Sequence, residues 1–303
     1  MRYRGKTEME EELLRFAEYL KNERRMAHNT LVSYERDLRQ MIIWLNAQGI
    51  TRPEKVTDTV LNSYVLWLER EGKATTTISR VVASTKAFFA YEAKKGVIPF
   101  NPAESLKAPK VEKKLPTVLT GAEVEAFLQQ TQGRTLKKLR DRAMLELLCA
   151  TGLRVSEIID LKVTDINLVI GYVNCSDGER ERAIPFGRAA QDALRVYLDE
   201  GRAQLMKNGE SDLLFVNISG SALSRQGFWK IIKYYGDKAG IRKDITPQAL
   251  RNSFAAHLLR NGTDMRSMQT MLGHSDLSVT HAYVSYINAG SGAGDRLSRG
   301  RRR

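Results

Sequence analysis

The chain has 303 residues, which is long enough for two domains that each bury a core. Its net charge of +13 favours a polyanionic partner such as nucleic acid, although a merely basic soluble protein has the same property. Its two cysteines, Cys149 and Cys175, form neither a metal pattern nor a disulfide framework. No apolar run is long enough to cross a membrane, so we expect an intracellular protein with no membrane partner.

Four amphipathic helices are predicted in the first hundred residues. Apolar side chains recur at helical spacing over residues 9–25, 31–45, 57–68 and 74–95, and short connections predict a helical bundle. Hydroxyl and basic side chains gather where the fourth helix begins, and such groups suit DNA phosphates. A plain helix cap explains the hydroxyls equally well. The candidate DNA contacts here are Lys73, Thr75, Thr76 and Arg80.

Residues 101–116 break this periodicity and contain three prolines. We interpret them as a basic linker between domain 1–100 and domain 117–286, with Lys110, Lys113 and Lys114 neutralising DNA phosphates. Two domains joined in this way are expected to close around a duplex. The Gly/Ser-rich and Arg-rich composition of residues 287–303 predicts a disordered basic tail.

The second domain mixes helices with a few strands, so the predicted fold class is mainly α with a small β-sheet. Thr120 and Glu123 form a capping-box pattern, and a long apolar helix is expected over residues 138–150. Alternating residues predict a β-hairpin from strands 168–175 and 180–185, and a further strand at 212–216. A helix over 224–239 carries Ser224 and Arg225, which face either DNA or solvent.

Residues 245–286 predict three short helices. Thr246 and Pro247 suit the N-cap and first position of a helix that ends at Asn261, and the second helix covers 265–272. A third carries Tyr283. Arg251 lies on the first turn, where a guanidinium and helix-end N–H groups are able to share one anion.

The order of Arg251, Phe254, Leu272-Gly273-His274 and Tyr283 resembles the catalytic signature of the tyrosine recombinases, the phage-integrase and Xer family. In that family the nucleophilic tyrosine follows the Gly-His histidine by nine residues, as Tyr283 follows His274. Residues 152–157 (GLRVSE) match the family's G-L-R-x-S-E box, and 28–38 (HNTLVSYERDL) resemble its N-terminal arm. The resemblance implies a four-helix SAM-like DNA-binding arm followed by a mixed α/β catalytic domain.

By the same resemblance, the catalytic residues are Arg154, Arg251, His274 and Tyr283. Family members cut DNA through a 3′-phosphotyrosine link and rejoin it without a metal or other cofactor. Two arginines stabilise charge on the phosphate, histidines place protons, and a lysine protonates the leaving 5′-oxygen. The implied partners are double-stranded DNA and a second recombinase subunit, identical or different, on the nucleoid in the cytoplasm.

Three positions depart from the family pattern. Gln248 and Asn252 stand where the family usually has histidine, and Asp177 occupies the lysine position of the hairpin. Arg180 and Arg182 follow Asp177 and are candidate electrostatic replacements and DNA contacts, but arginine is a poor proton donor. The tail also lacks the apolar stripe of the helix that usually docks into a neighbouring subunit. We therefore expect impaired chemistry.

Three functions remain open on the sequence. The first is a working site-specific recombinase, which the tyrosine and both arginines favour. The second is a catalytically inactive member of the fold that binds DNA as a sequence-specific or architectural protein, which Asp177 and Gln248 favour. The third is a nicking and closing enzyme like the type IB topoisomerases, which would act without a fixed site.

Overall fold

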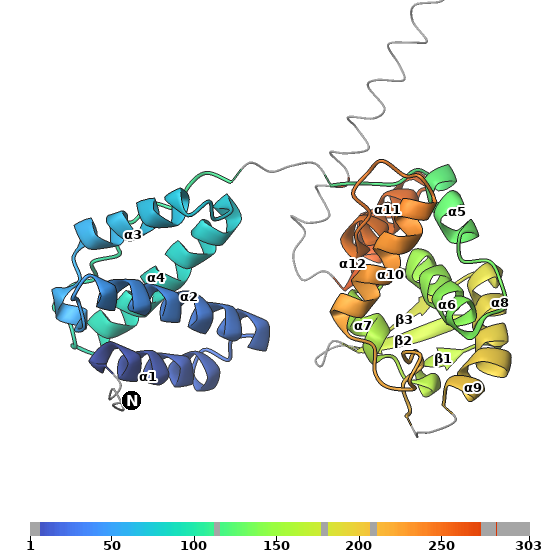
Figure 1. Ribbon diagram of the computed structural model, residues 1–303, viewed down its shortest axis with the longest axis horizontal. Helices are drawn as coiled ribbons and strands as arrows, with labels where there is room; N and C mark the ends of the chain where they lie inside the picture. The colour runs from blue at the N-terminus through green and yellow to red at the C-terminus, as the bar shows by residue number, and fades with distance from the viewer. Residues whose placement is uncertain (1–6, 112–115, 177–180, 207–210, 274–282, 284–303) are drawn as a thin grey trace, which may run out of the picture. The chain divides into compact units, whose positions relative to one another are not determined.

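The computed structural model describes residues 7–111, 116–176, 181–206, 211–273 and Tyr283 (Figure 1). The chain forms two compact units, Met1–Lys113 and Lys114–Arg303. Most of the described chain is helical and a single small sheet accompanies the helices, so the predicted fold class is confirmed. Within the described ranges, no helix is both long and apolar enough to span a bilayer.

The first unit is a bundle of helices around one hydrophobic core, as predicted. Phe16 and Phe88 meet edge to face in this core, with ring centroids 5.5 Å apart. The first helix ends earlier than predicted because Arg25 adopts a left-handed backbone conformation with φ 46°. The elements are α1 (Glu8–Asn22), α2 (His28–Ala47), a 3-10 turn (Pro53–Lys55), α3 (Asp58–Arg70) and α4 (Thr75–Lys94).

Part of the segment predicted as a linker packs against the first unit. Ala103 and Leu106 are buried in the helical core. The Ser79 hydroxyl donates to the carbonyl of Pro109 at 3.2 Å, and the Lys86 ammonium donates to that of Glu104 at 3.1 Å. Residues 103–109 therefore continue the first unit.

The second unit contains a three-stranded antiparallel sheet in the order β1-β2-β3. Its strands are β1 (Ile166–Asn167), β2 (Tyr172–Ser176) and β3 (Glu181–Pro185). Val173 pairs with Ile184, and both side chains are fully buried in the core. The first strand of the predicted hairpin begins later than expected, because Asn167 accepts the N–H groups of Val169 and Ile170 and so forms a turn.

Helices surround this sheet, and α6 lies between α8 and α11 (Figure 1). It begins after the cap Thr135 and ends at Gly152, whose φ of 62° suits glycine. The helices of the unit are α5 (Gly121–Gln129), α6 (Leu136–Thr151), α7 (Val155–Asp160), α8 (Arg188–Val196), α9 (Ala203–Leu205), α10 (Arg225–Lys238), α11 (Pro247–Arg260) and α12 (Met265–Leu272). A 3-10 turn (Val163–Asp165) precedes β1, and a π-helical turn (Tyr197–Arg202) connects α8 to α9.

The strand predicted at residues 212–216 is wrong. Leu213 and Val216 each form only an isolated bridge, to Lys162 and Ala222. The apolar run is present because Leu214, Phe215 and Val216 are fully buried in the core of the unit. A buried apolar run has the same composition in a strand and in an extended core segment, so periodicity did not separate them.

Candidate active site

Helix α11 carries three of the residues singled out in the sequence. The Thr246 hydroxyl caps the helix by accepting from the Ala249 N–H at 3.0 Å, and Pro247 occupies the first turn, as predicted. The three residues are Gln248, Arg251 and Asn252, and the last two follow Gln248 by three and four positions. That spacing places them on neighbouring turns of one helix face.

Arg251 is almost entirely buried, with 3% of its surface exposed. Its guanidinium donates to the carbonyl of Gly152 at 2.6 Å and to the carbonyl of Leu272. Burial and the charge of Arg154 lower the pKa of Arg251 to about 10. The guanidinium therefore remains cationic at neutral pH, close to where α6 and α12 end.

Arg154 reaches the same place from the N-terminus of α7. Its guanidinium donates to the Glu157 carboxylate at 2.9 Å and to the carbonyl of Gly273. The Arg154 side chain is 38% exposed, so one face of it remains open to solvent. The two predicted catalytic arginines thus converge on the last residues of α12.

Glu157 connects this arginine to the sheet. Its carboxylate also accepts from the Arg182 guanidinium at 2.7 Å, and Arg182 donates to the carbonyl of Met271 at 2.9 Å. Burial by itself would raise the pKa of Glu157, but hydrogen bonds from Arg154 and Arg182 and their charges outweigh it, and the pKa is lowered. Glu157 is therefore an anion between two cations.

Arg182 was a predicted DNA contact, and its environment differs from that expectation. Only 8% of its side chain is exposed, because the guanidinium is committed to Glu157 and to the end of α12. In β3 it pairs with Cys175, whose side chain points into the core. Arg182 therefore supports the candidate site from inside the protein rather than offering an exposed cation.

Tyr283 is buried, with 2% of its surface exposed, and packs with Ala255, Met268 and Leu272. Its hydroxyl donates to Asn252 Oδ1 at 2.9 Å. The Gln248 side-chain amide donates to the same oxygen at 2.8 Å. Burial raises the pKa of Tyr283, and the positive charge of Arg251 opposes that rise.

Several predicted site residues lie outside the described residues, namely Lys113, Lys114, Asp177, Arg180 and His274. The predicted third helix is described only at Tyr283, which is helical. The sequence analysis did not anticipate that Asn252 contacts Tyr283 or that Glu157 bridges Arg154 and Arg182. The four-residue spacing of Gln248 and Asn252 was an available signal for the contact between those two residues, but no sequence signal indicated the contact with Tyr283.

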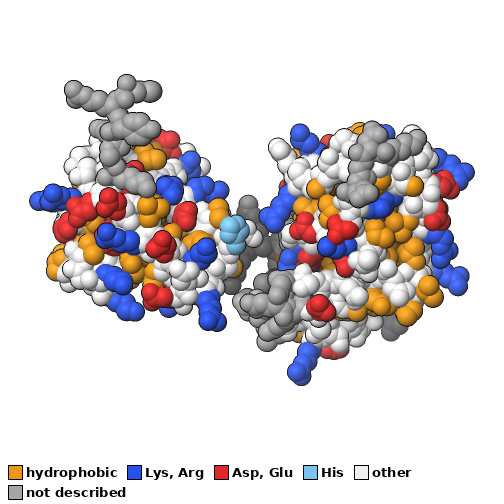
Figure 2. Space-filling view, turned by 90° about the horizontal axis from the view of Figure 1, so that it is seen from below, with side chains coloured by type: hydrophobic (Ala, Val, Ile, Leu, Met, Phe, Trp, Pro, Cys, Tyr) orange, Lys and Arg blue, Asp and Glu red, His pale blue; other side chains and the backbone are white. Residues whose placement is uncertain are grey.

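The predicted DNA contacts outside this site fall into two groups. Lys73, Thr75, Thr76 and Lys110 are exposed on the first unit, as are Ser224 and Arg225 on the second. Arg80 instead forms a two-point ion pair with Asp37, at 2.7 and 2.9 Å, which joins α4 to α2. Those hydrogen bonds raise the pKa of Arg80, against an opposing effect of burial. Basic and acidic side chains are interspersed on the face of each unit in Figure 2, so charge alone does not outline a DNA path there.

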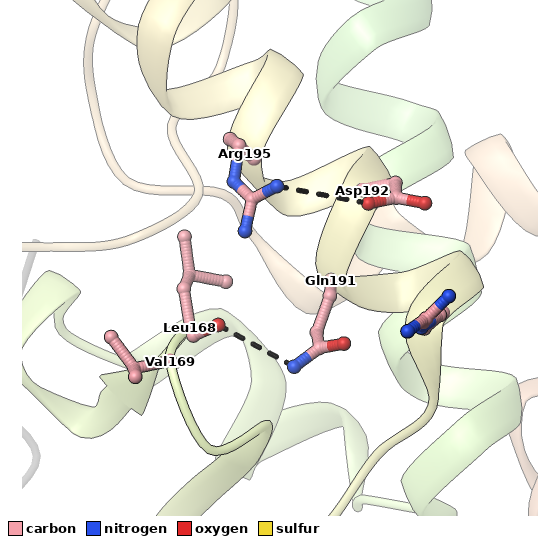
Figure 3. A pocket seen from close by; sticks show the side chains of 6 residues that line it. Leu168, Val169, Gln191, Asp192 and Arg195 are labelled. Carbon is pink, nitrogen blue, oxygen red and sulfur yellow. Dashed lines mark hydrogen bonds and ion pairs between the residues drawn. The ribbon is translucent and has the colours of Figure 1, made fainter.

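A pocket of about 620 Å³ lies elsewhere on the second unit, between the β1–β2 turn and α8 (Figure 3). Gln191 donates to the carbonyl of Leu168 at 3.4 Å across this pocket, and Asp192 faces Arg195 at its rim. It shares no residue with the cluster of Arg154, Arg251 and Tyr283. We therefore assign the candidate active site to that cluster.

Comparisons with known proteins identify the family to which the two units of the chain correspond. Residues 117–288 match the phage integrase family model, and residues 13–96 match the phage integrase N-terminal SAM-like domain. The chain is 44% identical over 280 residues to the tyrosine recombinase XerD of Halalkalibacterium halodurans, covering 90% of this chain and 92% of the relative. It is 39% identical over 289 residues to the tyrosine recombinase XerC of a Roseiflexus species, covering 94% of this chain and 92% of the relative.

Among solved structures, the chain resembles XerH site-specific recombinase bound to a palindromic difH substrate in a post-cleavage complex. The TM-score is 0.75 and the identity 21%, over 95% of this chain and 85% of the other, which shows the shared fold. The two family models together cover most of both units, and the curated relatives match along nearly their whole length. The chain therefore belongs to the phage integrase family of tyrosine recombinases.

Proposed function

We propose that this chain breaks and rejoins double-stranded DNA at a specific site through a 3′-phosphotyrosine link at Tyr283, with slow chemistry. The observation that carries the proposal is the meeting of three groups at the end of α12. Arg251 and Arg154 donate to the carbonyls of Leu272 and Gly273, and Tyr283 packs against Leu272. A nucleophile and two guanidinium groups in one place suit attack on a phosphodiester.

The reaction balances without an external redox or energy source. The Tyr283 oxygen forms a bond to phosphorus while the bond from phosphorus to the 5′-oxygen breaks. The phenol loses a proton and the 5′-oxygen gains one. Attack by a 5′-hydroxyl on the phosphotyrosine reverses both changes and rejoins the strand. Arg154 and Arg251 stabilise the negative charge that builds on the non-bridging phosphate oxygens in both directions.

Proton transfer is the step that we expect to be slow. Gln248 is able to donate a hydrogen bond but is not a base, and Asp177 has no proton to give at neutral pH. The burial of Arg182 against Glu157 supports the same conclusion, because that guanidinium is occupied inside the protein. Each missing proton-transfer group typically costs about a hundred- to ten-thousand-fold in rate.

The partners follow from the same proposal. A palindromic substrate, such as the one in the XerH structure, presents two equal half-sites and suits a pair of subunits related by two-fold symmetry. We therefore infer that this chain acts on DNA as an oligomer with itself or with another recombinase, on the nucleoid in the cytoplasm. Lys73, Thr75, Thr76, Lys110, Ser224 and Arg225 are the proposed exposed DNA contacts.

A DNA-binding protein that has lost its chemistry is the second candidate. The favouring observation is that the Tyr283 hydroxyl donates to a neutral amide, Asn252, which is not a base. Such a protein would bind the same DNA with the same fold and form no covalent link.

The decisive experiment recovers DNA that is covalently attached to the chain in its own cells. The protein is isolated under denaturing conditions and the retained DNA is sequenced, with Tyr283→Phe as the matched control. We expect DNA of one sequence from the native chain and none from the control. DNA recovered only after formaldehyde crosslinking would favour the second candidate.

Repair of the departures tests the slow chemistry on the recovered site. We expect the double variant Asp177→Lys with Gln248→His to cut the site at least about a hundred-fold faster than the native chain, because it regains proton transfer. The measurement is the rate of covalent linking to a nicked duplex. An unchanged rate would contradict the assignment of Asp177 to the lysine position.

A further inference from the structure

The side-chain amide of Asn252 forms hydrogen bonds through both its nitrogen and its oxygen. Its Nδ2 donates to the carbonyl of Thr117 at 3.3 Å, and its Oδ1 accepts from Gln248 Nε2 at 2.8 Å and from the Tyr283 hydroxyl at 2.9 Å. Only 7% of its surface is exposed. Its partners belong to α11, to the segment before α5 and to the part of the chain around Tyr283.

These contacts define the orientation of the amide. If the Asn252 amide were reversed, its nitrogen would face the Gln248 nitrogen and its oxygen would face the carbonyl of Thr117, and both pairs would repel. The Tyr283 hydroxyl therefore meets an acceptor. The phenol donates its hydrogen to Asn252, and the charge of Arg251 acts on the same hydroxyl.

We propose that Asn252 is a positioning residue for the nucleophile, directing the Tyr283 oxygen toward a phosphate bound by the arginines, and that Gln248 holds Asn252 in that orientation. The two departures from the family pattern on α11 thus act together. The neutral amide orients the hydroxyl but takes no proton from it. This inference rests on the proposed function, because it assigns Tyr283 the attacking role.

The first test examines the contact without DNA. NMR of the full chain with labelled asparagine side chains compares the native protein with Tyr283→Phe, which removes only the hydroxyl. We expect the Asn252 side-chain amide signals to move. The control is Tyr235→Phe, which removes a hydroxyl bound to Asp141 in the core and should leave Asn252 unchanged. Unmoved Asn252 signals in Tyr283→Phe would overturn the proposal.

The second test measures the rate of covalent linking at saturating DNA. We expect Asn252→Ala to be slower by about ten-fold, the effect of one lost positioning hydrogen bond, with unchanged DNA affinity. Asn252→His should recover most of the rate, since an imidazole nitrogen is able to accept from the tyrosine. Gln248→Leu should have a smaller effect in the same direction.

The matched control is Ser253→Ala. The Ser253 hydroxyl donates to the carbonyl of Ala249 at 2.7 Å and accepts from the N–H of Leu119 at 2.8 Å. Its loss loosens α11 against residues 117–119 as Asn252→Ala does, but leaves Tyr283 its acceptor. We expect it to keep the native rate at saturating DNA.

The outcomes separate this inference from the proposed function. A native rate or a faster rate in Asn252→Ala, or equal slowing in Ser253→Ala, overturns the positioning role while native cleavage upholds the proposed function. If the native chain forms no covalent link but the Asn252 signals still respond to Tyr283→Phe, the proposed function fails. The contact is then structural, and the positioning role falls with it.

Discussion

The buried carboxyl groups of Glu157 in the second unit and Glu92 in the first unit have opposite environments. Glu157 in the second unit accepts hydrogen bonds from Arg154 and Arg182, and its pKa is lowered even though burial acts in the opposite direction. Glu92 in α4 is fully buried, and neither of its carboxylate oxygens has a hydrogen-bond partner within the described ranges. Burial, with a smaller contribution from Glu12, raises the pKa of Glu92 to about 7.

The difference shows which of these buried carboxyl groups the protein stabilises in its charged form. At the candidate active site an anion is retained because it holds two guanidinium groups in place, and one of them is a proposed phosphate ligand. In the first unit the carboxyl group of Glu92 is buried without a hydrogen-bond partner among the described residues, so its neutral form is favoured. Of these two glutamates, the charged form is thus favoured for the one that cations accompany.

The largest effect is expected from Glu157→Gln. The variant leaves two buried or half-buried guanidinium groups without their anion, and we expect the free energy of unfolding to fall by about 3 kcal/mol. Linking to DNA should also slow by at least about ten-fold, since Arg154 loses the group that aims it. Urea unfolding and the single-turnover rate measure the two effects. A variant as stable and as fast as the native chain would show that the three-residue network does not hold the site.

Glu92→Leu should act in the opposite direction. It replaces an unpartnered buried carboxyl group with a side chain of similar size, and we expect the first unit to gain about 2 kcal/mol at pH 8. Hydrogen exchange of the α4 amides in the full chain measures this gain. Slower exchange is the expected result, and unchanged or faster exchange would contradict the environment described for Glu92.

The pH dependence follows from the signs of the two shifts. The pKa of Glu92 rises from 4.5 to about 7 on folding, so its contribution to stability is present below pH 4.5 and is lost as pH rises toward 7. The pKa of Glu157 is lowered from 4.5, so its contribution is present above that value and is lost as pH falls through the folded pKa.

Hydrogen exchange should therefore show α4 weakening from pH 5 to pH 8, and α7 weakening only in acid. Glu92→Gln should remove the first trend. The control Glu11→Gln changes an exposed glutamate of α1 and should leave the pH trend of α4 unchanged. If α4 protection stayed constant over this range in the native chain, Glu92 would have an ordinary pKa.

The smallest effect is expected from Arg134→Ala. Arg134 pairs with Glu200 at 3.1 Å, but their side chains are 82% and 45% exposed. Exposed pairs are screened by water, so the free energy of unfolding should change by less than about 0.5 kcal/mol. If urea unfolding showed that Arg134→Ala lowers the free energy of unfolding as much as Glu157→Gln does, burial would not explain why the Arg134–Glu200 pair and the Glu157 ion pairs differ.

The sequence by itself determined the local structure at the candidate site. Thr246 and Pro247 predicted where α11 begins, and the pattern of residues 265–272 predicted α12 with its observed bounds. The capping box of Thr120 and Glu123 is present at α5. These signals were readable because each depends on side chains that bond to backbone a few residues away.

Only the tertiary structure decided which distant groups meet. It brought Arg182 into contact with Glu157 and the Tyr283 hydroxyl into a hydrogen bond with Asn252, although these partners lie 25 and 31 residues apart in the chain. It also gave residues 212–216 only two isolated bridges and no continuous strand pairing. Each outcome depends on what another element presents across the core, and the periodicity of a single segment carries no information about that surface.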